Sequence, residues 1–167
     1  MAADFSVRAA TTDDIPALAS IYGREAREGY ATFDVEPRSH DAWLPYVGSS
    51  APGDLALVAV DDAHSVVLGY ATSSAYRPKP AYARTRESTV YVDPSAQGRG
   101  VGRALYAELL ARLRAAGVHV VVAFVALPNE ASTALHTSLG FTAAGTLREV
   151  GHKHDRWVDV ELWQLRL

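Results

Sequence analysis

The stretch Glu87–Arg103 reads ESTVYVDPSAQGRGVGR and combines a strand, a glycine-rich loop and the start of a helix. Residues 88–92 are β-branched or aromatic almost throughout, which is typical of a strand. Asp93-Pro94 ends the strand, because proline has no N–H to donate and restricts the residue before it. Apolar residues then recur every four positions from Val101 to Leu113, which indicates one helix face. The stretch predicts a strand over 87–93 and a helix over 100–116.

The loop between this strand and this helix has the features of an anion site. The first N–H groups of a helix have no partner within the helix, and the helix dipole adds partial positive charge there. Gly98, Gly100 and Gly102 would let a bulky anion approach the backbone, and Arg99 and Arg103 add positive charge. The spacing matches neither a Walker loop nor G-x-G-x-x-G. A glycine-rich turn without a ligand is the alternative.

Size and composition exclude several classes of protein. The 167 residues predict one domain over 1–167. The net charge of −3 and the pI of about 6.0 argue against a nucleic-acid or anionic-membrane binder. The chain has no cysteine, which rules out disulfides, a thiolate nucleophile and thiolate metal sites. No signal peptide or transmembrane run is evident, so we expect a soluble, cytoplasmic protein.

The remaining pattern predicts an α/β fold. Alternation and apolar runs predict further strands over 5–9, 55–60, 66–74, 118–126 and 157–165, with one more after Phe141. Helical spacing predicts a helix from about Ile15 to Glu28, a short helix capped by Ser39, and a helix between Asn129 and Gly140. The unit 87–126 has the length of a parallel βαβ crossover. We therefore expect a mixed central β-sheet flanked by helices on both faces.

Long motifs of the second half follow one another as ESTVYVDP, QGRGVG, LPNEASTALHTSLGF and LREVGHKHDRWVDVELWQL. With ATFDVEP near the N-terminus and RPKPAY before the central strand, they resemble the phosphinothricin and methionine sulfoximine acetyltransferases of the GNAT superfamily of N-acetyltransferases. The resemblance covers nearly the whole chain. It implies the GNAT fold, acetyl transfer from acetyl-CoA to the α-amine of a small amino acid, and a homodimer.

The same resemblance assigns the glycine loop to the diphosphate of coenzyme A. Backbone groups of the central strand would meet the pantetheine arm as an added strand does. Asn129 is also a candidate N-cap of the helix that follows it. The residues implied for cofactor binding are Val90, Tyr91, Val92, Gln97, Gly98, Arg99, Gly100, Val101, Gly102, Arg103 and Asn129.

Two residues are implied for catalysis, Glu87 and His136. An amine at neutral pH is mostly ammonium, so a carboxylate must take its proton, directly or through water, before it attacks a thioester. The resemblance places this base at Glu87, and the alternative is a glutamate paired with Arg84 or Arg86. His136 would protonate the departing thiolate or hold the acceptor carboxylate, and the alternative is a helix histidine bonded to a nearby carbonyl.

The acceptor, a small-molecule amine, is expected beside the basic loop 76–86. Prolines 78 and 80 stiffen this loop, so its charges would attract an acidic acceptor. Arg84 and Arg86 are as well explained by a solvated loop. His152 and Asp155 depart from the family pattern and bear on substrate choice. The residues implied for acceptor binding are Phe33, Arg77, Lys79, Tyr82, Thr89 and Lys153.

No metal site is expected. His152, His154, Asp155 and Asp159 lack metal-ligand spacing and are interpreted as a polar hairpin tip. Two alternative functions stay open. One is N-acetylation of another amine, such as a protein N-terminus or another amino acid, and the other is a non-catalytic CoA-binding module.

Overall fold

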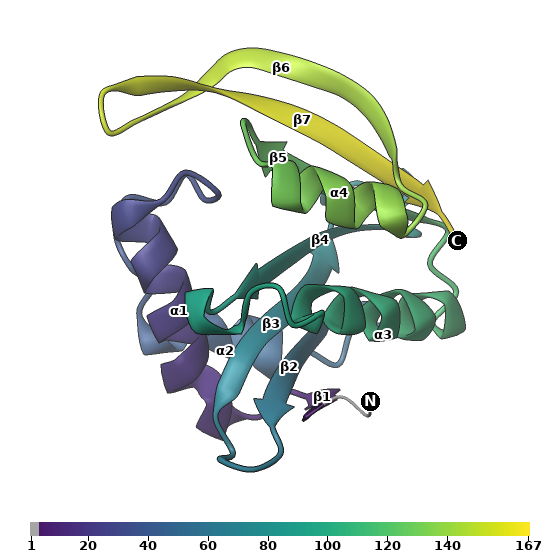
Figure 1. Ribbon diagram of the computed structural model, residues 1–167. Coiled ribbons are helices and arrows are strands. Elements are labelled where there is room, and N and C mark those ends of the chain that lie inside the picture. Colours follow the sequence, from purple (N-terminus) through teal and green to yellow (C-terminus); the bar gives the residue numbers. More distant parts are fainter. Residues whose placement is uncertain (1–3) are drawn as a thin grey trace.

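The computed structural model describes residues 4–167, in which seven strands form one mixed sheet (Figure 1). Across the sheet their order is β1-β2-β3-β4-β5-β7-β6. Only β4 and β5 are parallel, because a helical crossover joins them, and all other neighbours are antiparallel. In chain order the strands are β1 (Phe5–Ala9), β2 (Leu55–Asp61), β3 (Val67–Ala75), β4 (Thr85–Val92), β5 (Val120–Ala126), β6 (Thr142–Lys153) and β7 (Arg156–Arg166).

Helices cover both faces of this sheet, as the sequence predicted. The four α-helices are α1 (Ile15–Glu28), α2 (Leu44–Val47), α3 (Val101–Ala115) and α4 (Glu130–Ser138). Side chains alternate between the faces of a strand, so Leu57 of β2 packs with α3 while Val58 packs with α1. Figure 1 shows α3 and α4 in front of the sheet and α1 and α2 beside and behind it. No helix within residues 4–167 is long and apolar enough to cross a membrane.

The parallel pair is incomplete, and this opens the sheet. β4 and β5 pair only from Thr85↔Val120 to Glu87↔Val122. Beyond Glu87, β4 remains paired with β3 as far as Val92. β5 in turn remains paired with β7 as far as Ala126. Because each strand follows its outer neighbour, an opening forms between their carboxyl-terminal halves.

Most element boundaries agree with the sequence analysis, and two expectations need correction. The strand expected over 118–126 begins later, at Val120, and its Phe124 is 37% exposed because β5 borders the opening. The basic loop 76–86 is also shorter than expected. β4 already begins at Thr85, and a turn of 3₁₀ helix over Pro80–Tyr82 lies within the loop.

Candidate active site

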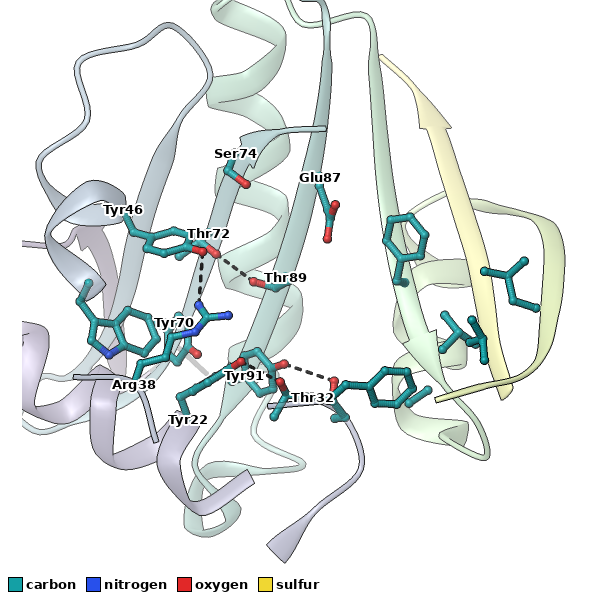
Figure 2. A pocket seen from close by; sticks show the side chains of 18 residues that line it. Tyr22, Thr32, Arg38, Tyr46, Tyr70, Thr72, Ser74, Glu87, Thr89 and Tyr91 are labelled. Carbon is teal, nitrogen blue, oxygen red and sulfur yellow. Dashed lines mark hydrogen bonds between the residues drawn. The ribbon is translucent and has the colours of Figure 1, made fainter. Parts of the chain in front are cut away.

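Two cavities flank the opening between β4 and β5 and meet through it. One has a volume of about 410 Å³, and Figure 2 shows its side chains. The other, of about 520 Å³, is lined by the glycine loop, α3, α4 and the open edges of both strands, and we call it the glycine-loop cleft. Thr89, Tyr91 and Phe124 line both cavities. We call the first one the tyrosine cavity after Tyr22, Tyr46, Tyr70 and Tyr91.

The glycine-loop cleft offers unpaired backbone groups of β4. The N–H of Asp93 donates to the carbonyl of Leu68 at 2.8 Å, so Asp93 directs its N–H away from β5. Backbone groups alternate in direction along a strand, and those of Val90 and Val92 therefore face the opening. β5 no longer pairs with β4 at this level. A ligand with amide groups can bond there as a strand would.

The glycine loop ends at the N-terminus of α3 in a form that suits phosphate. Gly98 and Gly100 have φ values of 76° and 82°, a conformation that glycine adopts without strain. No heavy atom lies within 4 Å of the place where a Cβ would stand on either residue. A bulky anion can therefore come close to the free N–H groups at the start of α3.

All residues assigned to the cofactor by sequence line this cleft except Arg99. The guanidinium of Arg99 makes ion pairs with Asp4 at 2.7 Å and Asp61 at 3.5 Å, so the expected free positive charge is held by two carboxylates. Arg103 lines the cleft and donates to Oγ of Ser138 at 2.7 Å. The predicted N-cap is confirmed, since Oδ1 of Asn129 accepts the N–H of Ser132 at 3.0 Å.

His136 also lines the cleft, where it is 2% exposed. Its Nδ1 lies 2.7 Å from the carbonyl oxygen of Ser132 and must therefore donate. Nε2 then accepts from the hydroxyl of Tyr106 at 3.0 Å. Burial lowers the pKa of His136 and therefore favours a neutral ring. The hydrogen bond to the Ser132 carbonyl has the opposite effect on the pKa but is the weaker of the two. The carbonyl bond foreseen as the structural alternative is present, and His136 does not line the tyrosine cavity. Sequence reasoning overlooked Tyr106.

The floor of the tyrosine cavity is built from rows of paired residues on β3 and β4. Tyr70 pairs with Tyr91, Thr72 with Thr89, and Ser74 with Glu87. The two threonine hydroxyls are bonded to each other at 2.8 Å. All these side chains share one face by the period of two. Sequence reasoning found Glu87 and Thr89 but missed Thr72 and Ser74, which the hairpin register would have revealed.

Glu87 lies in this cavity with a carboxyl group suited to proton transfer. Burial raises the pKa of Glu87, and the positive charge of Arg77 offsets part of this effect. No salt bridge joins Glu87 to Arg84 or Arg86. Arg84 donates to the carbonyl of Gly117 at 3.0 Å, and Arg86 donates to that of Ala83 at 3.1 Å. Both arginines are therefore structural.

The basic side chain of the tyrosine cavity is Arg38, which the sequence analysis did not single out. Its Nε donates to Oδ2 of Asp34 at 3.0 Å, and its Nη1 donates to the hydroxyl of Tyr46 at 3.3 Å. Its guanidinium also stacks on the ring of Tyr22 at 4.3 Å. Burial opposes the charge, but Tyr22, Tyr46 and Asp34 outweigh it and raise the pKa of Arg38.

Four residues assigned to the acceptor by sequence do not line the tyrosine cavity, namely Arg77, Lys79, Tyr82 and Lys153. Arg77 lies over the ring of Tyr76, which in turn packs edge-on against Tyr82. Lys153 is 2% exposed, and its ammonium donates to the carbonyls of Thr32 at 2.7 Å and Glu25 at 3.2 Å. It therefore ties the last hairpin to the loop after α1. Phe33 and Thr89 do line the cavity.

Within residues 4–167, no three His, Asp or Glu side chains gather as metal ligands would. His152 packs against Trp157 and His154 against Tyr30. Asp159 instead accepts from Arg148 at 2.6 Å.

Comparison with known proteins agrees with this geometry. The model of the Acetyltransferase (GNAT) family matches residues 15–141. A phosphinothricin N-acetyltransferase of Streptomyces coelicolor is 44% identical over 164 residues, which cover 97% of this chain and 96% of that protein. The chain belongs to the GNAT family of acetyltransferases.

Two further GNAT relatives illustrate the range of similarity. An L-methionine sulfoximine/L-methionine sulfone acetyltransferase of Pseudomonas aeruginosa is 34% identical, with 97% of this chain and 94% of that protein covered. The crystal structure of a GNAT phosphinothricin acetyltransferase from Sinorhizobium meliloti, in complex with AcCoA, superposes with a TM-score of 0.92. The two sequences are 33% identical, and the superposition covers 98% of this chain and 89% of the Sinorhizobium meliloti chain.

The glycine loop of this GNAT enzyme generates a first prediction. Gly100→Asp should weaken acetyl-CoA binding roughly 10- to 100-fold, because a carboxylate would face the diphosphate and block its approach. Gly117→Asp is the matched control. Gly117 also has a positive φ, of 76°, with open space around it, but lies at the other end of α3. Calorimetry should show a loss of acetyl-CoA affinity in Gly100→Asp only. Equal affinity in the two variants would mean that the glycine loop does not bind acetyl-CoA.

Proposed function

We propose that this GNAT enzyme transfers acetyl from acetyl-CoA to the α-amine of a small amino acid of the phosphinothricin or methionine sulfoximine kind. The observation that carries the proposal is the meeting of the two cavities at Thr89, Tyr91 and Phe124, with Glu87 on the tyrosine-cavity side. A donor in the glycine-loop cleft and an acceptor in the tyrosine cavity would come together there.

The residues of the cleft suit acetyl-CoA, which would supply the acetyl group as a thioester. The free N–H groups at the start of α3 and the open glycines would hold the diphosphate. The backbone of Val90 and Val92 would hold the pantetheine amides, and one of these N–H groups would polarise the acetyl carbonyl.

Glu87 would act as the general base. The amine must lose a proton to form its new bond to the acetyl carbon, and the carboxylate of Glu87 accepts that proton, directly or through one water. Its raised pKa makes Glu87 a stronger base than an exposed glutamate. The sulfur of coenzyme A would leave the acetyl carbon as a thiolate and take up a proton.

The acceptor class rests on charge and on the relatives. The tyrosine cavity contains a fixed cation, Arg38, and Lys153 is buried close behind its wall at Thr32. With the carboxylate of Glu87 in the same cavity, this arrangement favours an acceptor that carries both an amine and a negative charge, and Arg38 disfavours a polyamine. The relative named for phosphinothricin supports an acceptor with an anionic side chain, and the relative named for methionine sulfoximine and methionine sulfone supports a small amino acid more generally. A mass-spectrometric screen of amino acids, peptide N-termini and polyamines with acetyl-CoA tests this, and acetylation of only the last two would refute the class.

Replacement of the base gives the second prediction. Glu87→Gln should keep acetyl-CoA affinity but lower kcat by roughly 10²–10⁴-fold, because the amide accepts no proton. In the wild type, activity should rise with pH through the pKa of Glu87, above the usual glutamate range, because only the carboxylate is active. This acid limb should be absent from the variant.

The control for charge removal is Glu108→Gln, at the ion pair with Arg112 on α3. It should have the wild-type rate and pH profile. Wild-type turnover in Glu87→Gln would instead mean that solvent or another group takes the proton.

The third prediction concerns His136. His136→Phe removes the hydrogen bonds that the imidazole ring makes to the Tyr106 hydroxyl and the Ser132 carbonyl, so it should lower the unfolding free energy by about 1–3 kcal/mol. Since His136 lies outside the tyrosine cavity, the acceptor KM should stay unchanged and kcat should fall less than about tenfold. A hundredfold loss of kcat with normal stability would establish His136 as the acid that protonates the thiolate.

We also propose the homodimer that the family resemblance implies. Val150 and Trp157 of the last hairpin are 52% and 60% exposed, which supports their burial against a second copy. Sedimentation should give twice the monomer mass, and Trp157→Ser should shift the protein toward monomer. A monomeric wild type would refute this fourth prediction.

A further inference from the structure

We propose that Arg38 determines acceptor specificity by binding the negatively charged oxygen group at the far end of the acceptor side chain. This assignment rests on the proposed acetylation of a small amino acid and adds a residue that contacts the acceptor. It differs from the expectation drawn from sequence, in which the exposed loop carrying Arg77 and Lys79 binds the acidic end.

The guanidinium of Arg38 is held in one position. Asp34 fixes Nε and Tyr46 fixes Nη1, while the ring of Tyr22 supports the guanidinium plane. The ring centroid of Trp43 also lies 5.7 Å from the central carbon of the guanidinium. A cation held in this way loses little conformational entropy when it binds an anion, which strengthens the bond relative to a mobile surface arginine.

Arg38 also has donors to spare. Nη2 makes no hydrogen bond to any residue within the described range 4–167, whereas Nε and Nη1 are engaged. Figure 2 shows the guanidinium entering the cavity between Tyr46 and Tyr22. Its free edge matches the two oxygens of a carboxylate or phosphinate.

The charges around Arg38 leave room for an anion. Asp34 is the negative group in contact with it, and Asp34 is also influenced by the buried ammonium of Lys153. Among the described residues, Asp34 is the one carboxylate paired with Arg38. Glu25 also lies near Lys153 and partly balances its charge. The other carboxylate of the cavity, Glu87, lies at the opposite end of the β4 rows.

The spacing of the rows selects which acceptor group reaches Arg38. Tyr22 packs edge-on against Tyr91 at 5.4 Å between ring centroids, so Arg38 lies at the Tyr91 end. Tyr91 and Glu87 are four residues apart, roughly 13 Å along the strand. The α-carboxylate is adjacent to the amine and stays near Glu87. The terminal group of the side chain points toward Arg38 instead.

The test compares two acceptors that share an α-amine and α-carboxylate but differ at the end of the side chain. Phosphinothricin carries a negative phosphinate there, and methionine sulfone carries a neutral sulfone. Arg38→Gln should lower kcat/KM for phosphinothricin roughly 10- to 100-fold, mainly through KM, and for methionine sulfone less than about fivefold. Calorimetric affinity for phosphinothricin should fall in parallel, while acetyl-CoA affinity stays unchanged.

Two more variants make the result decisive. Arg38→Lys keeps the charge but not the planar fork, so it should show a smaller loss with the same selectivity even if Arg38→Gln folds poorly. Arg112→Gln, on the surface of α3, is the control for removing an arginine. Equal losses for both acceptors, or no loss, in a folded Arg38 variant would overturn the role assigned to Arg38 but leave the proposed function standing. A wild-type enzyme that acetylates neither acceptor would overturn the proposed function and the assignment with it.

Discussion

The site depends on one constraint, the early end of the β4–β5 ladder. β4 keeps its hydrogen bonds to β3 and β5 keeps its bonds to β7, while β4 and β5 pair with each other only as far as Glu87 and Val122. Backbone groups that stay unpaired in an interior are costly, so an opening of this kind persists because a ligand or water can use it. The opening alone lets a ligand on one face of the sheet meet a ligand on the other.

Alternation along β4 then divides the chemistry between the two faces. Glu87, Thr89 and Tyr91 face the tyrosine cavity. Ser88 points the other way, and its Oγ lies 3.1 Å from the hydroxyl of Tyr106, which with Ser88 lines the glycine-loop cleft. Burial on the first side raises the pKa of Glu87, and the fixed guanidinium of Arg38 supplies the opposite charge. The proposed base and the proposed anion-binding group would thus be held on one surface, as an oriented amino-acid acceptor requires.

Local pattern was enough to predict the elements and the glycine loop, because glycine spacing, caps and strand alternation act within a few residues. It was not enough for the charged side chains, whose partners are distant in sequence. Arg99 pairs with Asp4 and Asp61, and Lys153 donates to the carbonyl of Thr32. As a result, Arg99 does not line the glycine-loop cleft and Lys153 does not line the tyrosine cavity, where the sequence had placed them. Arg38 was missed for the same reason, since only folding brings Tyr46 and the strand rows beside it.

Amide hydrogen exchange of β4, followed by NMR with and without acetyl-CoA, tests the role of the opening most directly. Acetyl-CoA should slow exchange at Val90 and Val92, whose N–H groups face the opening. Thr89 and Tyr91 should change little, because their N–H groups already bond to β3. Equal protection along the strand, or none at Val90 and Val92, would contradict the account.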